Sequence, residues 1–280
     1  MNRPASLAAL GTFAFSGIAS AAYAQTYIFF PNNATINYTV FGETVIGYAN
    51  NTDYKNKKNG SSPTINIKNG SGFDSVLTYN HSITNVSGGT IPGGLIAQDF
   101  SQGAITGGSF SLLATDNSSK FTINGGSFFN GIYAYNTSSI TFRGGSSNNL
   151  TAFNISAINV QGGSVNYVQI FDNSLMNITG GVINSFLAYQ NSTLNLYGAG
   201  MSATLINAQS NVGGIITSQY VLSGTLSDGS DLTGKQLFIQ NNTSPRVFLH
   251  NAAVPEPGSL ALLFGMGTVG VCVLRKRRRG

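Results

Sequence analysis

The 280-residue chain is poor in the residues on which most enzymes and nucleic-acid-binding proteins depend. It has one cysteine, two histidines and no tryptophan, and only 8% of its residues are charged. Because Cys272 has no partner cysteine, an intramolecular disulfide and a cysteine-based metal site are both excluded. The isolated His81 and His250 suit the surface better than a metal cluster or a catalytic triad. We therefore expect no metal and no other cofactor.

The N-terminus has the pattern of a secretory signal peptide. Arg3 supplies the positive charge, residues 5–18 form the apolar stretch, and Ala22 and Ala24 form a small-x-small cleavage sequence. We expect residues 1–24 to be a signal helix that is removed by cleavage after Ala24. The polar sequence that begins directly afterwards argues against a lasting membrane-spanning helix here.

The C-terminus has three parts in a fixed order. The tripeptide Pro255-Glu256-Pro257 is followed by an apolar segment, residues 260–274, and by a basic tail, residues 275–280. At a rise of about 1.5 Å per residue, the apolar segment spans about 22 Å as a helix, which is short for a hydrocarbon core of about 30 Å. We expect a short transmembrane helix with its basic tail in the cytoplasm.

This arrangement resembles the PEP-CTERM sorting tail of Gram-negative bacteria that make exopolysaccharide. The resemblance covers only the end of the chain. It implies an exosortase-type sorting enzyme as a partner, export through the inner membrane, a C-terminal membrane anchor, and a final position at the cell surface or outside the cell. An ordinary single-pass anchor is the alternative, but it leaves the Pro-Glu-Pro motif unexplained.

The basic character of the chain belongs to these two ends. Without Arg3 and the five basic residues of the tail, eight of the 14 Lys and Arg residues stay, against nine Asp and Glu. The exported part therefore has a net charge of about −1, and nothing in it favours nucleic acid as a partner.

Glycine pairs mark a repeat in the middle of the chain. Such pairs begin at Gly88, Gly107, Gly125, Gly144, Gly162 and Gly180, and Gly70 and Gly198 extend the series. The interval between consecutive markers is nearly constant. A period of about 18 residues predicts a solenoid, in which each unit buries its apolar face against the next unit. The eight markers predict about eight coils.

Three columns of similar residues recur at fixed places within this repeat. An apolar column consists of Val76, Leu95, Leu113, Ile132, Leu150, Val168 and Phe186. An amide and carboxylate column consists of Asn80, Asp99, Asn117, Asn136, Asn154, Asp172 and Gln190. A serine column consists of Ser82, Ser101, Ser119, Ser138, Ser156, Ser174 and Ser192. Apolar residues two apart indicate strands, and the Asn column indicates a corner.

We predict an all-β fold, a single-stranded parallel β-helix that is similar in general form to autotransporter passengers and pectin-lyase-like solenoids. Uneven spacing of the apolar columns favours the right-handed form over a left-handed hexapeptide helix. Residues 64–216 are expected to form the coils. Residues 25–63 and 217–250 are expected to cap the two ends, which would otherwise be open sheet edges. Residues 251–259 form a linker that carries the sorting motif.

Solenoids of this shape include polysaccharide lyases and hydrolases, so a carbohydrate-active enzyme is the alternative to a non-catalytic protein. Glycosidases need two carboxyl groups about 5–9.5 Å apart. Asp99 and Asp172 stand four coils apart, which is about 19 Å at about 4.8 Å per coil. Arg143, the one arginine in the coils, has no acidic cluster near it in the repeat. We expect no catalytic residues and no enzymatic activity.

The residue before each position of the Asn column is expected to face solvent, because its neighbours point inward. In four consecutive coils this residue is aromatic: Tyr135, Phe153, Phe171 and Tyr189. Such a stripe has two interpretations. It binds exopolysaccharide by stacking on sugar rings, or its rings stack on one another and stabilise the ladder. The sequence thus predicts an exported, membrane-anchored or exosortase-processed, non-catalytic protein of the cell surface or matrix, with the aromatic stripe as its candidate binding site.

Overall fold

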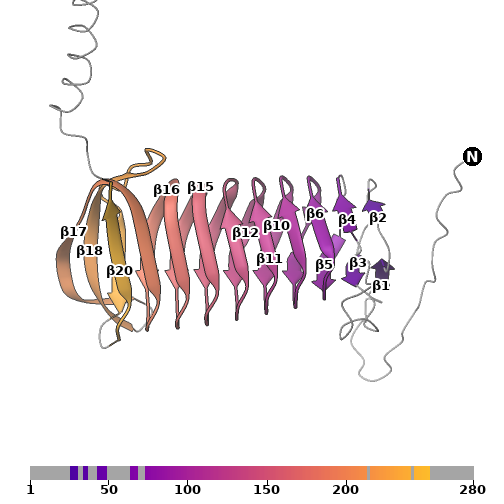
Figure 1. Cartoon of the computed structure of the whole chain (residues 1–280), viewed down its shortest axis with the longest axis horizontal. Helices are drawn as coiled ribbons and strands as arrows, with labels where there is room; N and C mark the ends of the chain where they lie inside the picture. Colours follow the sequence, from indigo (N-terminus) through magenta and orange to yellow (C-terminus); the bar gives the residue numbers. More distant parts are fainter. Residues whose placement is uncertain are drawn as a thin grey trace, which may run out of the picture.

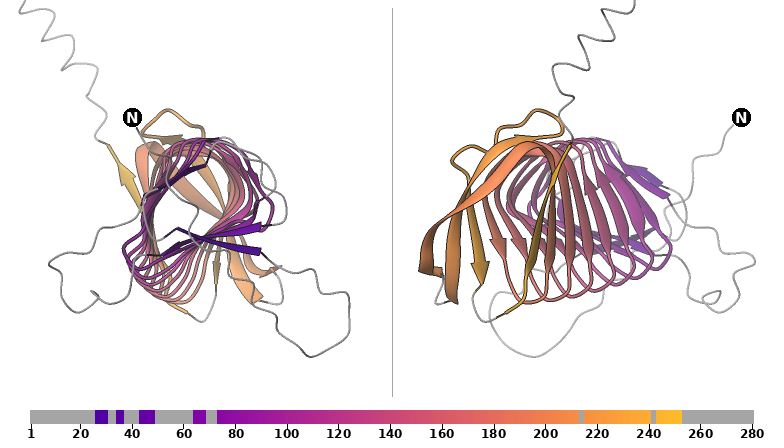
Figure 2. Two further views of the ribbon diagram at one scale, coloured as in Figure 1. Left: turned by 90° about the vertical axis from the view of Figure 1, so that its right-hand side faces the viewer. Right: turned by 60° about the vertical axis from the view of Figure 1, so that its left-hand side comes forward.

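The computed structural model describes residues 26–30, 34–36, 43–48, 64–68, 73–212, 215–240 and 243–252, and all of its regular elements there are β-strands. They wind into a rod of stacked coils (Figure 1). Seen along the rod, successive coils overlie one another around a closed cross-section (Figure 2, left). The all-β parallel solenoid is therefore confirmed. The right-handed sense of the coil stays a prediction.

The strands form three parallel ladders. The first ladder contains β1 (Thr26–Phe30), β3 (Glu43–Tyr48), β5 (Phe73–Tyr79), β8 (Leu95–Ala97), the later residues of β10 (Ser109–Thr115), β12 (Ser127–Ala134), β14 (Ser146–Ala152), β15 (Ala157–Ile170) and β16 (Leu175–Ala188), and then β19 (Gln236–Gln240). The third ladder begins with β7 (Thr90–Ile91). It continues in the first residues of β10, β12 and β14 and then in the middle of β15 and β16.

The second ladder runs along the other side of the coil. It contains β2 (Ala34–Ile36), β4 (Thr64–Ile67), β6 (Ile83–Val86), β9 (Gln102–Ile105), β11 (Lys120–Ile123), β13 (Ser139–Phe142), the first residues of β15 and β16, β17 (Thr193–Val212) and β20 (Arg246–Asn251). From β6 to β17, partners in neighbouring strands are one period of the repeat apart, as in Phe121 with Ile140 and Ile140 with Ile158. The period in the sequence is thus the length of one turn of the solenoid.

Apolar side chains from all three ladders fill the interior. The column from Val76 to Phe186 is fully buried in every turn, and so are the paired positions of the second ladder, such as Ile140 and Phe142. The rings of Phe110 and Phe128 stack inside the third ladder with centroids 4.9 Å apart. Because each turn covers the apolar face of the one before it, the core is continuous along the rod.

The Asn column forms a corner between the first and second ladders. All seven of its residues have left-handed backbone, with φ between 53° and 60°. Asn and Asp tolerate this conformation better than other residues with a side chain. Seven such corners mark about seven turns, so the expected eight coils were one too many.

The Gly-Gly pairs are needed for two different reasons, which Gly125 and Gly126 illustrate. A Cβ atom on Gly125 would lie 2.6 Å from the carbonyl oxygen of Thr106 in the preceding turn, so the backbones approach too closely for a side chain. Gly126 has a φ of 102°, which L-residues rarely adopt. The first glycine permits close stacking and the second permits the bend.

The regular winding changes at Gly198, inside the range 64–216 that the sequence assigns to the coils. From there β17 continues into an antiparallel hairpin with β18 (Ile215–Leu226). The chain then returns to the rod, where β19 pairs in parallel with β16, and β20 pairs in parallel with β17. β18 also pairs antiparallel with β19, and so covers the edge of that strand.

The opposite end of the rod has a simpler arrangement. β1 pairs in parallel with β3, and β2 pairs in parallel with β4. The strands in the range expected to form the N-terminal cap therefore extend the same two ladders.

Candidate binding surfaces

The four aromatic residues expected to form a stripe lie together on the outside of the first ladder, just before the corner. The ring centroids of Tyr135 and Phe153 are 5.0 Å apart, those of Phe153 and Phe171 are 4.9 Å apart, and those of Phe171 and Tyr189 are 4.6 Å apart. The ring planes differ by 2° to 10°. The stripe is therefore a continuous stack of rings with one ring in each turn.

Stacking leaves little of the ring faces open to solvent. Tyr135, Phe153 and Phe171 are partly buried. Tyr189 is only 5% exposed, so the expectation that it faces solvent was wrong. It lies in the last turn before β19 adds a further layer, which explains why its surroundings differ from those of the other rings. Burial raises the pKa of the Tyr135 and Tyr189 hydroxyls above the ordinary value of tyrosine.

The corner beside this stack is held by a ladder of side-chain hydrogen bonds. The backbone N–H of Asn154 donates to a carboxylate oxygen of Asp172 at 2.8 Å, and the N–H of Asn136 donates to the side-chain oxygen of Asn154 at 3.2 Å. The N–H of Asp172 donates to Oε1 of Gln190, and that of Gln190 to Oε1 of Gln240 at 3.0 Å. Each side chain thus satisfies a backbone group of the preceding turn.

The acidic residues at and beside the corner accept hydrogen bonds from neighbouring turns. Asp172 and Asp99 accept bonds from the backbone of neighbouring turns, and Asp116 accepts a bond from the side-chain amide of Asn136. Within the described residues there is no group of three or more His, Cys, Asp or Glu that could hold a metal ion. The carboxylates of the corner thus link neighbouring turns.

Asp228 fastens the turn after β18 to the last Gly-Gly corner. Its Oδ2 accepts a bond from the N–H of Gly181 at 2.8 Å, and its Oδ1 accepts one from the N–H of Ser230 at 2.9 Å. Partial burial by itself would raise the pKa of Asp228. The hydrogen bonds from Ser230 and Gly181 outweigh this effect and hold the pKa below its ordinary value.

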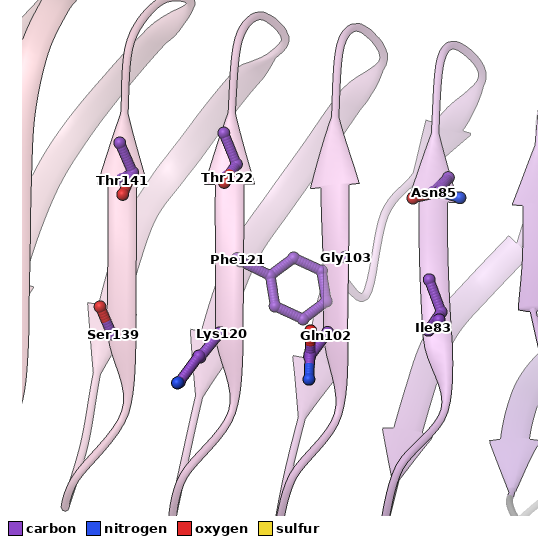
Figure 3. A pocket seen from close by; sticks show the side chains of 9 residues that line it. All are labelled: Ile83, Asn85, Gln102, Gly103, Lys120, Phe121, Thr122, Ser139 and Thr141. Atoms are coloured by element: carbon purple, nitrogen blue, oxygen red, sulfur yellow. The ribbon is translucent and has the colours of Figure 1, made fainter. Parts of the chain in front are cut away.

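A hollow of about 380 Å³ opens on the outer side of the second ladder, across β6, β9, β11 and β13 (Figure 3). Most of its lining is polar. It consists of Ile83, Asn85, Gln102, Gly103, Lys120, Phe121, Thr122, Ser139 and Thr141. The ring of Phe121 reaches across toward Gly103, where a Cβ atom would lie 2.5 Å from the ring (Figure 3). The lining contains no carboxylate.

The hollow lies where an outward column of asparagines is interrupted. At neighbouring turns this column begins with Asn66 and Asn85 and resumes with Asn159, Asn177 and Asn195, whose amides bond from turn to turn at 2.9 to 3.0 Å. Between them stand Ala104, Thr122 and Thr141, which are shorter. This site was not predicted from the sequence. The break in the Asn column was the signal that would have revealed it.

The remaining predicted sites lie outside the described residues. These are the cleavage residues Ala22 and Ala24, the motif Pro255, Glu256 and Pro257, and the signal and membrane helices. In the described part of the chain, no helix is both long and apolar enough to cross a membrane.

The observed features define a class, the parallel β-solenoids. The sequence after the last described strand forms a further segment of the chain. That segment is identified by a family model. The PEP-CTERM protein-sorting motif matches residues 253–279, as its residues had indicated. Neither the curated proteins nor the solved structures contain a match to the chain.

Proposed function

We propose that the protein is an exported, non-catalytic rod of the cell surface or extracellular matrix that associates with exopolysaccharide. The PEP-CTERM motif carries the first half of this proposal, because it indicates export with exosortase processing and C-terminal anchoring. The body supports the non-catalytic role and the association with polysaccharide. Its corner carboxylates bond to neighbouring turns, and its outer hollow is lined mostly by amides and hydroxyls, with Lys120 and without an acid.

The aromatic stripe contributes to this function mainly as a stack that stiffens the rod. Sugars bind aromatic residues through the ring faces, and in Phe153 and Phe171 those faces meet neighbouring rings. A polysaccharide that lies along the stripe would meet ring edges and the Tyr135 hydroxyl. We therefore expect the stripe to add only a modest part of the affinity for exopolysaccharide.

Retention on the exopolysaccharide of the producing cells tests the proposal. The mature protein should be retained and should release no soluble sugar fragments during a long incubation. Absence of retention would contradict the association, and release of fragments would favour the polysaccharide lyase or hydrolase instead. Replacing Phe153 and Phe171 by Ala separates the stripe from the rest of the surface. Abolished retention by this folded variant would show that the stripe is the principal site.

A further inference from the structure

Positive charges are concentrated on one of the two main ladders, and the acidic residues lie outside its strands. Of the five Lys and Arg residues at described positions, four lie in or directly after strands of the second ladder: Lys68, Lys120, Arg143 and Arg246. The strands of that ladder contain no Asp or Glu. Acidic residues at described positions lie in β3, at the start of β5, at the corner, and in the turn after β18. The nearly neutral body therefore has one basic side.

The hollow lies on this basic side. Lys120 lines it at the start of β11, and Arg143 follows β13 two residues after Thr141, which also lines it. In the register of the ladder, Arg143 lies beside residue 124, which is four positions after Lys120. Along the strand direction, Arg143 is therefore displaced from Lys120 by about 13 Å. The two cations thus stand in adjacent layers on the β11 and β13 side of the hollow, and Arg143 lies just beyond the residues that line it.

Both cations have capacity to bind an anion. Lys120 is exposed, and within the described residues no carboxylate pairs with it. Arg143 is also exposed and uses its Nε–H to donate to Oε1 of Gln161 at 2.9 Å, which leaves its terminal N–H groups for another acceptor. Such groups bind carboxylates and similar anions well.

The polar groups that line the hollow suit hydroxyl-rich ligands. Gln102, Asn85, Thr122, Ser139 and Thr141 provide amide and hydroxyl groups that both donate and accept hydrogen bonds. The interrupted asparagine column gives a ligand room to reach them. A membrane surface would instead require exposed apolar side chains, and the lining offers only Ile83 and the buried Phe121.

From these observations we infer that the hollow binds a segment of an acidic polysaccharide, with carboxylate groups at Lys120 and Arg143 and sugar hydroxyls at the polar side chains that line the hollow. This inference rests on the proposed association with exopolysaccharide and assigns it to a site and to a chemical class. It also predicts that binding weakens with salt, since exposed charges are screened within about 10 Å at 0.1 M ionic strength.

The test uses the mature protein, polygalacturonate as an acidic probe and dextran as a neutral probe. The inference predicts binding to polygalacturonate and not to dextran. The double variant Lys120→Gln and Arg143→Gln should bind polygalacturonate about tenfold more weakly, as expected for two exposed charge contacts. The double variant with Glu at both positions should bind more weakly still.

Arg246→Gln is the matched control. Arg246 is in the same column as Lys120, five layers farther along the second ladder, or about 24 Å away. Its replacement removes one positive charge, as each substitution of the double variant does, and should leave the affinity within about twofold. All of these positions are exposed, so unchanged circular dichroism is expected for each variant.

The outcomes distinguish this inference from the proposed function. If Arg246→Gln weakens binding as much as the double variant, or if the double variant binds normally, the hollow is not the site. Equal binding to dextran, or preferential binding to phosphatidylglycerol vesicles, would overturn the acidic-polysaccharide assignment. In each of these cases retention on the native exopolysaccharide would still support the proposed function. Absence of that retention would contradict both.

Discussion

The ring of Phe171 lies 4.9 Å from that of Phe153, with the two planes 10° apart, although the two residues are a full period apart in the sequence. This spacing matches the distance of about 4.8 Å between neighbouring strands of a sheet. The rings therefore follow the strands that carry them. Equivalent positions in consecutive repeats are therefore neighbours in space. The ring stacking, the amide hydrogen bonds and the packing of the core all depend on this arrangement.

Truncation of the aromatic stack should destabilise the rod. Replacing Phe153 by Ala removes contacts with both Tyr135 and Phe171, and for a partly buried ring we expect a loss of about 2 kcal/mol in unfolding free energy. Urea denaturation measures this loss. Phe129→Ala is the control, because that ring is 68% exposed and should contribute less than about 0.5 kcal/mol. Equal effects of the two substitutions would contradict a stabilising stack.

The left-handed corner predicts an unusual order of stability for substitutions at Asn154, whose φ is 59°. Both Gly and Ala remove the side-chain oxygen that accepts the N–H of Asn136. Only Ala also places a Cβ atom in a left-handed backbone, which costs about 1 kcal/mol. The Ala variant should therefore be less stable than the Gly variant by about that amount in thermal or urea unfolding. The reverse order would mean that the corner is not left-handed.

The close approach of neighbouring turns predicts that Gly125 tolerates no side chain. Ala at this position places a carbon atom 2.6 Å from the Thr106 carbonyl oxygen, so the backbone must shift, and we expect a loss of about 2 kcal/mol or more. Asn124→Ala, at the exposed neighbouring position, should change stability by less than about 0.5 kcal/mol. Comparable unfolding midpoints for the two variants would contradict the observed stacking distance.

Acid should weaken the attachment of the turn that carries Asp228. The pKa of Asp228 is lower in the folded protein than in the unfolded chain, so its contribution is fully present above the unfolded value of about 3.9 and is lost as the pH falls through the folded value. The difference in unfolding free energy between the wild type and Asp228→Asn should therefore be larger at pH 7 than at pH 3. A difference that grows in acid would show that the sign is wrong.

Deletion of residues 255–280 tests the sorting motif directly. Without the motif and the apolar segment, the protein should appear in the periplasm or the medium instead of the membrane fraction. Cell fractionation and immunoblotting measure the distribution, with the full-length chain as the control. Continued membrane association of the shortened chain would contradict anchoring through this motif.

The repeat explains why so much of the fold was predictable. In a solenoid, residues that contact one another are separated by one period, so the recurring positions of Leu150, Asn154 and Ser156 are enough to assign the interior and the corner. The PEP-CTERM motif was equally recognisable because its residues are contiguous. The sorting motif and the parallel solenoid are both confirmed.

The features that the sequence did not predict are those that break the period. The return of β19 and β20 to the rod after the β17–β18 hairpin depends on pairings between residues far apart in the chain, such as Ala188 with Ile239. The burial of Tyr189 occurs in the turn next to that returning strand. The hollow arises from Ala104, Thr122 and Thr141, where shorter side chains interrupt a column. The period of the sequence thus predicts the recurring positions, whereas the hollow lies where the asparagine column is interrupted.

Engineered disulfides between turns test the central claim, that each repeat of the sequence lies directly on the previous one. Asn159 and Asn177 are direct partners in adjacent strands, whereas Asn159 and Asn195 are two layers apart. A disulfide needs Cα atoms about 4.4–6.8 Å apart, which adjacent layers satisfy and a separation of about 10 Å does not. In a Cys272→Ser background, mild oxidation should close the pair Asn159→Cys and Asn177→Cys and leave Asn159→Cys and Asn195→Cys reduced. If the first pair stays reduced, or if both pairs close equally, the turns do not stack in this register.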